Sequence, residues 1–215
     1  LMPLVSVIIP NYNHAPYLKQ RIDSVLNQTY QDFEVIILDD LSTDNSREII
    51  EQYRTHPKIS QIIYNDENSG STFKQWNKGI GLAKGEWIWI AESDDYADLQ
   101  FLEKLLLKIT EEKDVVLIYC RSNLINSKGE NIGSRPPNKV KAKDYWLDDY
   151  IHLGKYENEQ IFYFRNIISN ASSVLFKKVN FISIPKKLYF DMRYAGDWMV
   201  WINLIEHGKI YYLNK

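Results

Sequence analysis

The first 120 residues alternate short apolar runs with stretches in which apolar side chains recur at helical spacing. The apolar runs predict buried strands at residues 5–9, 35–38, 59–64, 86–91 and 115–120. The stretches between them predict helices at residues 15–28, from 42–45 to about 53, 72–83 and 99–111. Strands that alternate with helices are typical of β-α units, so we predict an α/β fold with a mainly parallel sheet.

The alternation stops after residue 120, and the remaining chain has a looser pattern. Residues 127–130 favour a hairpin turn, and residues 134–140, which include two prolines, favour a loop. Beyond them we expect a helix near 144–153, a strand near 172–176 and a helix near 197–206. The chain ends just after an apolar run, so we expect the natural protein to continue beyond residue 215.

Composition narrows the class of protein. Hydrophobic residues make up 45% and charged residues 25%, which excludes a disordered chain. Lys plus Arg number 26 against 28 for Asp plus Glu. The chain therefore has no excess of positive charge that would attract nucleic acid. A single cysteine, Cys120, excludes an internal disulfide and favours a reducing compartment. No segment approaches the roughly 20 apolar residues that span a bilayer.

Polar side chains gather where three of the predicted strands end. They lie at 10–13, at Asp39 and Asp40, and at 92–95. Ligands of open parallel sheets bind beyond these strand ends. The carboxylates within 92–95 would repel one another unless a cation offset their charge, and hard carboxylate oxygens suit Mg²⁺ or Mn²⁺. The alternative is a solvated acidic turn in which Asp95 or Asp98 caps the next helix.

Three further features each allow two interpretations. One carboxylate of Asp39 and Asp40 is placed to bind a nucleobase or ribose while the other braces the loop. Residues 68–74 are suited to a diphosphate, with Lys74 as the cation, or form a plain loop, since they lack the known phosphate-loop fingerprints. Asp197 follows Gly196 and is either a general base or a helix cap.

Several ordered segments give the chain its resemblance to a known family. They are VSVIIPNYNHAPYL at 5–18, SVLNQTY at 24–30, DFEVIILDD at 32–40, STD at 42–44 and AKGEWI at 83–88. Asp94 with Asp95, and Gly196 with Asp197, follow in the same order. Together they resemble the family 2 glycosyltransferases, strongly to about residue 120 and more loosely beyond it.

The resemblance implies a GT-A fold, a Rossmann-like sheet with helices on both faces, and transfer of a sugar from a nucleotide diphosphate with inversion. It implies a nucleotide-sugar-binding portion at 1–120 and, within the same domain, an acceptor-binding and catalytic-base portion at 121–215. Pro10, Asn11 and Tyr12 would then frame the base and ribose.

The remaining site residues come from the same resemblance. Asp40 would pair with the base, and Lys74 would contact phosphate. Asp94 would contribute to the nucleotide site, and Asp94 and Asp95 would hold a divalent cation, Mn²⁺ or Mg²⁺. Asp197 would deprotonate the acceptor hydroxyl. Many family members begin the acidic cluster with Asp where this chain has a longer Glu at position 92.

The partners expected from the resemblance are a nucleotide-diphospho-sugar, with a UDP-sugar favoured, and a saccharide or lipid-linked acceptor of the cell surface. This acceptor would place a cytoplasmic chain at the inner face of the membrane, with peripheral contact. Two alternatives stay open. One is a non-catalytic carbohydrate-binding scaffold. The other is a sugar nucleotidyltransferase, although residues 10–13 lack the glycine and cation that its phosphate loop requires.

Overall fold

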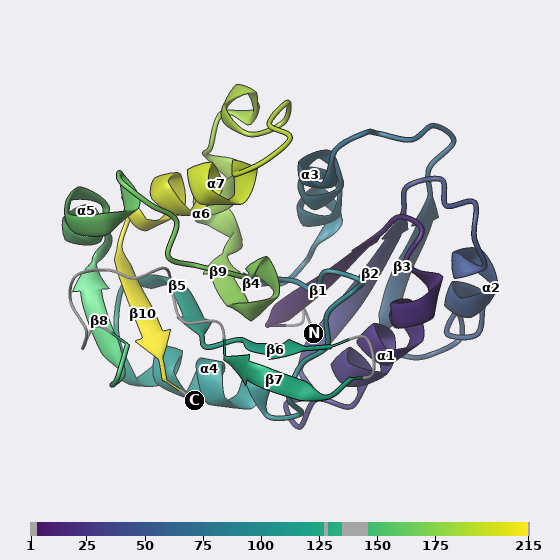
Figure 1. Ribbon diagram of the computed structural model, residues 1–215, viewed down its shortest axis with the longest axis horizontal. Helices are drawn as coiled ribbons and strands as arrows, with labels where there is room; N and C mark the ends of the chain where they lie inside the picture. The colour runs from purple at the N-terminus through teal and green to yellow at the C-terminus, as the bar shows by residue number, and fades with distance from the viewer. Residues whose placement is uncertain (1–3, 127–128, 135–145, 215) are drawn as a thin grey trace.

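The computed structural model describes residues 4–126, 129–134 and 146–214. In the first portion, strands and helices alternate as the sequence predicts (Figure 1). These elements are β1 (Val5–Asn11), α1 (Ala15–Leu26), β2 (Phe33–Asp39), α2 (Ser46–Glu51), β3 (Ile59–Tyr64), α3 (Thr72–Leu82), β4 (Trp87–Ile90), α4 (Phe101–Glu111) and β5 (Val115–Cys120). Each predicted strand and helix of this portion is therefore confirmed.

The second portion contains shorter elements. They are β6 (Asn123–Ile125), β7 (Asn131–Ser134), β8 (Tyr150–Leu153), α5 (Gly154–Glu157), a π-helical turn (Asn158–Phe162), a 3-10 turn (Ala171–Ser173), β9 (Val174–Lys177), α6 (Lys178–Ile182), a second 3-10 turn (Lys186–Leu188), α7 (Gly196–Ile205) and β10 (Lys209–Leu213). Strands β6 and β7 pair in antiparallel register, as a hairpin requires. Residues 127–128 of the predicted turn, and 135–140 of the predicted loop, lie outside the described residues.

One sheet carries most of the chain, in the order β3-β2-β1-β4-β9-β5-β10-β8. Strand β1 runs parallel to both β2 and β4, and β5 runs parallel to β10. Strand β9 enters antiparallel between β4 and β5, and β8 pairs antiparallel with β10 at the edge. The sheet is therefore mainly parallel, and strands from the second portion complete it.

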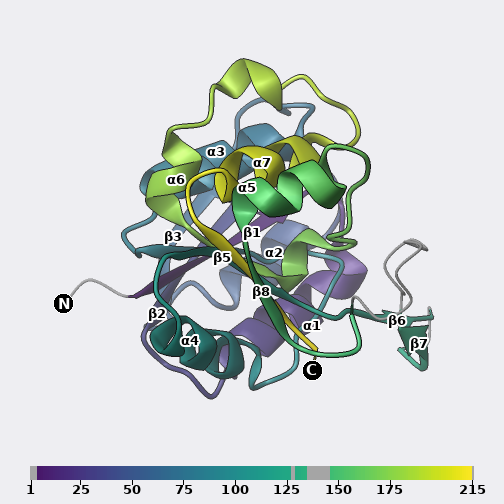
Figure 2. The same ribbon diagram turned by 90° about the vertical axis from the view of Figure 1, so that its left-hand side faces the viewer.

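Helices cover both faces of this sheet (Figures 1 and 2). Alternate residues of β1 point to opposite faces, as a strand requires. Ile8 packs with Trp76 of α3 and Trp201 of α7 in one core cluster. On the other face, Val7 packs with side chains of α1 and α4 in a second cluster. This layered α/β architecture is that of the GT-A fold.

One predicted helix is wrong. Of the range 144–153, residues 144–145 lie outside the described residues, and Tyr150–Leu153 form strand β8. The partner explains the difference, because Tyr150 to Leu153 pair residue by residue with β10, which local periodicity does not reveal. The position of Gly85 just after a predicted helix predicts a left-handed helix cap, and this prediction is also wrong. The φ of Gly85 is not positive, and a Cβ there would lie 2.6 Å from the Ser6 nitrogen.

Candidate functional site

The ends of β1, β2 and β4 open into a hollow of about 480 Å³, which we call the cleft. Most residues predicted to bind a ligand meet here. Of that set, the cleft is lined by Pro10, Asn11, Tyr12, Asp40 and Asp94. The predicted ligand site beyond the strand ends is thus a single concave surface built from segments far apart in the sequence.

Asp39 and Asp40 are both buried and both brace loops beside the cleft. Asp39 accepts hydrogen bonds from Asn11 Nδ2 at 2.8 Å and from Ser42 Oγ at 2.6 Å. Asp40 Oδ1 accepts from Asn65 Nδ2 at 2.6 Å, the Ser69 amide at 2.9 Å and Gln75 Nε2 at 3.0 Å, whereas Oδ2 accepts from Ser69 Oγ at 2.7 Å. Asp40 therefore ties the loop before α3 to the end of β2.

Two amide side chains in the cleft have an oxygen without a partner. Asn11 and Gln75 are 2% and 4% exposed, and among the described residues nothing donates to Asn11 Oδ1 or Gln75 Oε1. Both residues line the cleft. A buried acceptor without a donor costs free energy, so these oxygens mark places where a bound molecule would supply N–H or O–H groups.

The acidic turn after β4 rests on a buried arginine that sequence reasoning missed. Arg21 of α1 is 0% exposed. Its Nε donates to the Glu92 carbonyl at 2.7 Å, and its Nη2 donates to Ser172 Oγ at 3.0 Å and lies 3.8 Å from Asp95 Oδ2. Burial lowers the pKa of Arg21 to about 10, against the opposing effect of Asp95, Glu92 and Asp94. The cation that the clustered carboxylates require is therefore partly supplied by the chain itself.

Glu92 faces the cleft, but one of its oxygens is engaged. Trp76 Nε1 donates to Glu92 Oε1 at 2.8 Å. Burial raises the pKa of Glu92 to about 7, and the nearby charges of Asp94 and Asp95 add to the rise. Trp76 in turn packs on Trp201 of α7, with ring centroids 5.8 Å apart. The longer carboxylate at position 92 thus links the acidic turn to α3 and, through ring packing, to α7.

Asp197 lies in the first turn of α7, which begins at Gly196 after Ala195 in the left-handed region. The N-cap residue of α7 is Ala195, so Asp197 lies inside the helix and not at the N-cap position that its alternative interpretation requires. Asn166 Nδ2 donates to Asp197 Oδ2 at 3.1 Å. Burial raises the pKa of Asp197, while hydrogen bonds from the Trp198 amide and Asn166 oppose that rise. A Cβ on Gly196 would lie 2.4 Å from Phe73 of α3, so glycine allows the close approach expected from the sequence.

Three predicted residues are outside the lining of the cleft. Lys74 lies in the first turn of α3, and its ammonium donates to the Ser69 carbonyl at 3.3 Å. Asp95 turns toward Arg21 and lines a second hollow. Asp197 is not among the residues that line the cleft, and its neighbour Gly196 packs against Phe73, which follows the lining residue Thr72.

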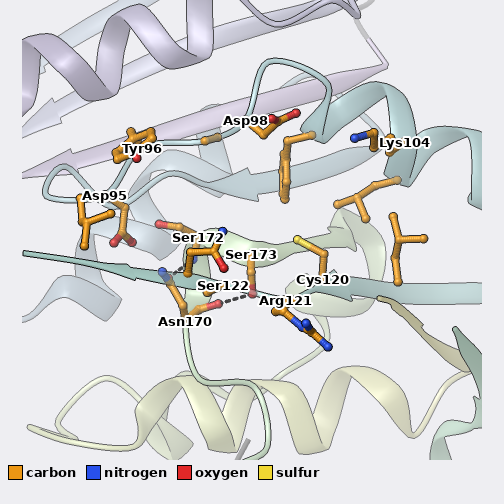
Figure 3. Close-up of a pocket in the computed structure, with 16 residues that line it drawn as sticks. Asp95, Tyr96, Asp98, Lys104, Cys120, Arg121, Ser122, Asn170, Ser172 and Ser173 are labelled. Carbon is orange, nitrogen blue, oxygen red and sulfur yellow. Dashed lines mark hydrogen bonds between the residues drawn. The ribbon is translucent and has the colours of Figure 1, made fainter. Parts of the chain in front are cut away.

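The second hollow, of about 400 Å³, is lined by Asp95, whereas the preceding residue, Asp94, lines the cleft. We call it the side cavity. Figure 3 shows Asp95, Tyr96 and Asp98 on one wall, Asn170 and Ser172 opposite, and the end of β5 beside them. Its lining combines carboxylates, amides, hydroxyls and an exposed aromatic ring, which are groups suited to a polyhydroxyl ligand.

The described residues contain no group of three or more His, Cys, Asp or Glu arranged to hold a metal ion. Asp94 is exposed at the cleft, and Asp95 is half-buried beside it. Mg²⁺ and similar ions in phosphate sites commonly take only one or two carboxylates and complete their shell with phosphate and water. The oxygen donors of this turn fit that arrangement.

Comparison with known proteins gives a family match over most of the chain. The model of "Glycosyl transferase family 2" matches residues 6–177. The "Putative teichuronic acid biosynthesis glycosyltransferase TuaG" of Bacillus subtilis is 40% identical over 96% of this chain and 73% of its own length. Glycosyltransferase GlyG of Streptococcus pneumoniae is 39% identical over 59% of this chain and 42% of its own length.

Among solved structures, S. aureus TarS 1-349 in complex with UDP superposes with a TM-score of 0.73 at 22% identity. The match covers 98% of this chain and 58% of that one, and it supports the same fold. The chain thus spans only part of the proteins that it resembles. Within the described residues, no helix has both the length and the apolar character needed to cross a bilayer.

Proposed function

Since the chain belongs to glycosyl transferase family 2, we propose that it transfers a sugar from a nucleotide diphosphate to an acceptor hydroxyl, with inversion at the anomeric carbon. The observation that carries this proposal is the cleft. It joins an acidic turn at the end of β4 to unpaired amide oxygens near the ends of β1 and β2.

We assign the nucleotide to the cleft, with Pro10, Asn11 and Tyr12 along the base and ribose. Asp40 holds the loop that forms one wall, and its Oδ2, which accepts a single hydrogen bond among the described residues, keeps acceptor capacity for the base. Lys74 stays a candidate for phosphate contact, because the bond from its ammonium to the Ser69 carbonyl is long and easily exchanged.

The diphosphate end of the nucleotide belongs at the acidic turn. Asp94, with Asp95 as a second ligand, would hold Mg²⁺ or Mn²⁺ there. When bound, such an ion offsets the charge that develops on the departing diphosphate. Arg21 fixes the turn from beneath, so that Asp94 is presented to the cleft.

Asp197 is the proposed general base. Its carboxylate takes the proton of the acceptor hydroxyl as that oxygen attacks the anomeric carbon on the face opposite the leaving diphosphate. Burial of the carboxylate raises its pKa, which makes it a stronger base than an exposed Asp. Asn166 holds one of its oxygens and orients the other.

The acceptor is assigned to the portion at 121–215, with 1–120 serving the donor. The side cavity supports this division, because Ser122, Asn123 and Asn170 from the second portion line it beside Asp95 and Tyr96. A saccharide, free or lipid-linked, fits this lining. Relatives named for teichuronic acid biosynthesis and chondroitin synthesis favour a cell-surface polysaccharide or glycolipid as the product, and peripheral contact at the cytoplasmic face of the membrane would suit such an acceptor.

UDP-sugars are the first donors to test, since the TarS structures include complexes with UDP and with UDP-GlcNAc. The experiment measures release of UDP from a panel of UDP-sugars with Mn²⁺ or with EDTA. We expect metal-dependent release that Asp197→Asn suppresses while nucleotide binding persists. Robust formation of pyrophosphate from sugar phosphate and UTP would instead support a nucleotidyltransferase, and sugar binding without nucleotide or metal would support a scaffold.

A further inference from the structure

We propose that the exposed chain near the start of α7 is a docking surface for an anionic lipid bilayer. Its side chains are Phe164, Arg165, Lys186, Lys187, Arg193 and Tyr194. We call this set the docking surface. The inference deepens the proposed function, because it names the surface by which the enzyme would meet a membrane-linked acceptor, and only that role in transfer rests on the proposed function.

The charge of this part of the chain differs from that of the whole protein. From Arg165 to Arg193 there are six Lys or Arg residues and one acidic residue, Asp191. The whole chain has 26 basic and 28 acidic residues, so positive charge is concentrated in this segment. Lys186 and Lys187 are both exposed. An exposed basic segment in a chain of net negative charge attracts a negatively charged partner.

Two aromatic side chains of the docking surface stand out into solvent. Tyr194 is 76% and Phe164 is 75% exposed, the highest values among the large hydrophobic side chains of the described residues. Neither residue lines the cleft or the side cavity. Aromatic rings beside basic side chains are the groups that anchor proteins at the interface between a membrane and water. The exposed rings therefore fit insertion among lipid headgroups.

The docking surface lies beside the proposed base and the cleft. Asn166, two positions after Phe164, donates to Asp197 Oδ2 at 3.1 Å. Ser71, which lines the cleft, donates from its Oγ to the Phe190 carbonyl at 2.9 Å. The yellow-green chain that precedes α7 extends farther from the sheet than α7 itself (Figures 1 and 2). A bilayer against this projecting chain would therefore lie next to both sites.

A bilayer fits these observations better than an acidic protein does. Charge alone would suit either partner, but an acidic protein surface gives no apolar environment to the two most exposed rings. An anionic bilayer supplies phosphate groups for the basic side chains and a hydrocarbon boundary for the rings. Its attraction for basic side chains is screened by salt, so the binding should depend on ionic strength.

The test is sedimentation of the 215-residue chain with lipid vesicles at low and high salt. One set of vesicles contains phosphatidylglycerol and phosphatidylcholine in equal parts, and the other contains phosphatidylcholine alone. We expect at least about tenfold tighter binding to the anionic vesicles, weakening as salt increases. Substituting Lys186→Gln together with Lys187→Gln should weaken that binding by about tenfold or more, because each basic residue near the surface adds to the attraction.

A second variant tests the rings, and a third is the matched control. Phe164→Ser with Tyr194→Ser leaves the charge unchanged and should also weaken binding severalfold. Leu107→Ser with Lys113→Gln removes an exposed apolar and an exposed basic side chain in and just after α4, which covers the other face of the sheet. The control should bind vesicles like the wild type. All the substituted side chains are exposed, so the melting temperatures should stay close to that of the wild type.

Each of the other outcomes overturns the inference. Absent binding to anionic vesicles, or equal binding to neutral ones, removes the docking surface and leaves the proposed function standing, since neither measurement involves a nucleotide. Weakening in the lysine variant with none in the aromatic variant would indicate an electrostatic surface that fits an acidic protein instead. Equal weakening in the control would show that the binding is not confined to this surface. Failure to bind UDP would overturn the proposed function without changing the vesicle result.

Discussion

Arg21 shows how one buried side chain changes the electrostatics of the site. The carboxylates after β4 suggest a bound cation by their mutual repulsion, yet the guanidinium beneath them already offsets part of that charge. A bound metal ion would then add its positive charge to that of Arg21, which is always present. Contacts from Arg21 within the chain hold the turn in place, which is the preorganisation that the proposed phosphate site would need.

Removing that arginine should make the fold depend on metal. Arg21→Met leaves the carboxylates without their counter-charge, and we expect a loss of about 3 kcal/mol, the lower end for a broken buried pair, because Asp95 is 32% exposed. Thermal unfolding with and without Mg²⁺ checks this prediction. The variant should gain more stability from Mg²⁺ than the wild type does, and an equal gain in both proteins would contradict it.

Asp94→Asn tests the proposed metal ligand. The amide keeps the shape of the side chain but loses the charge that holds a divalent cation, so metal-dependent UDP affinity should disappear while the fold survives. Calorimetry with Mn²⁺ and with EDTA measures the effect. Unchanged Mn²⁺-dependent affinity would remove Asp94 from the metal site.

We expect the ionised Asp197 carboxylate to lower the stability of the folded protein at neutral pH, although the proposed reaction requires it. Its pKa is raised in the folded state, so the folded protein holds that proton more tightly than the unfolded chain. The associated stability is therefore present at low pH and is lost as pH rises through the raised pKa. At neutral pH Asp197→Asn should raise the melting temperature while abolishing transfer, and the gain should shrink at pH 4.

The activity of the wild type should depend on pH in the opposite direction from the stability that Asp197 contributes. A base must be ionised to accept a proton, so kcat should fall as pH decreases through a pKa above that of an ordinary Asp. A pH–rate profile measures this limb. A variant Asp197→Asn that melts lower than the wild type at neutral pH, or that still transfers sugar, would return Asp197 to a structural role.

Residue patterns predicted the cleft but not the partners that orient its side chains. Asn11, Asp40 and Asp94 follow predicted strands, and the structure brings all three to the lining of one cleft at the strand ends. Arg21 looks like one more helical surface residue, because its contacts lie 71 and 151 positions away. The orientation of Gln75 likewise depends on Asp40, 35 positions earlier. Such long-range pairings leave no local signal.

At the scale of elements, the contact between α3 and α7 places Asp197, the proposed base, next to the helix that contributes Thr72 and Gln75 to the cleft. Phe73 packs against Gly196, and Trp76 packs against Trp201 one turn further along α7. Trp76 also donates to Glu92 in the acidic turn. Movement of either helix would therefore change the position of Asp197 relative to the cleft.

Gly196→Ala tests this contact directly. The added methyl would lie 2.4 Å from the Phe73 ring, so the ring or α7 must move. We expect a loss of about 1–3 kcal/mol of stability, as for other overpacked sites, together with a lower kcat. Gly81→Ala is the control, because its Cβ would meet nothing within 4 Å. Equal effects of the two variants would refute the role of the contact.

Most elements of the first portion could be predicted because β1, β2, β4 and β5 are almost wholly buried and have sequences that are nearly continuous apolar runs. The second portion was harder. Strand β8 is short and lies at the sheet edge, where it is only partly buried, so its apolar pattern is weak. Pairing with β10 decided its conformation. A local sequence pattern likewise could not predict that β9 inserts between β4 and β5.

At the scale of the whole molecule, one sheet carries both hollows at neighbouring strand ends. The cleft and the side cavity share the acidic turn, with Asp94 in one and Asp95 in the other. Under the proposed function, donor and acceptor would bind on either side of this one short segment. This arrangement also explains why the second portion joins the sheet of the first, since β9 and β10 bring their own residues to the same edge.

The central claim is that the cleft binds a nucleotide diphosphate with help from a divalent cation. Thermal unfolding with UDP, in Mn²⁺ and in EDTA, tests it most directly. At about 100 times the dissociation constant, a ligand adds roughly 2.7 kcal/mol, which should raise the melting temperature by about 5–11 °C. We predict that rise with Mn²⁺ and a much smaller one with EDTA. No shift with UDP, GDP or dTDP under either condition would contradict the account.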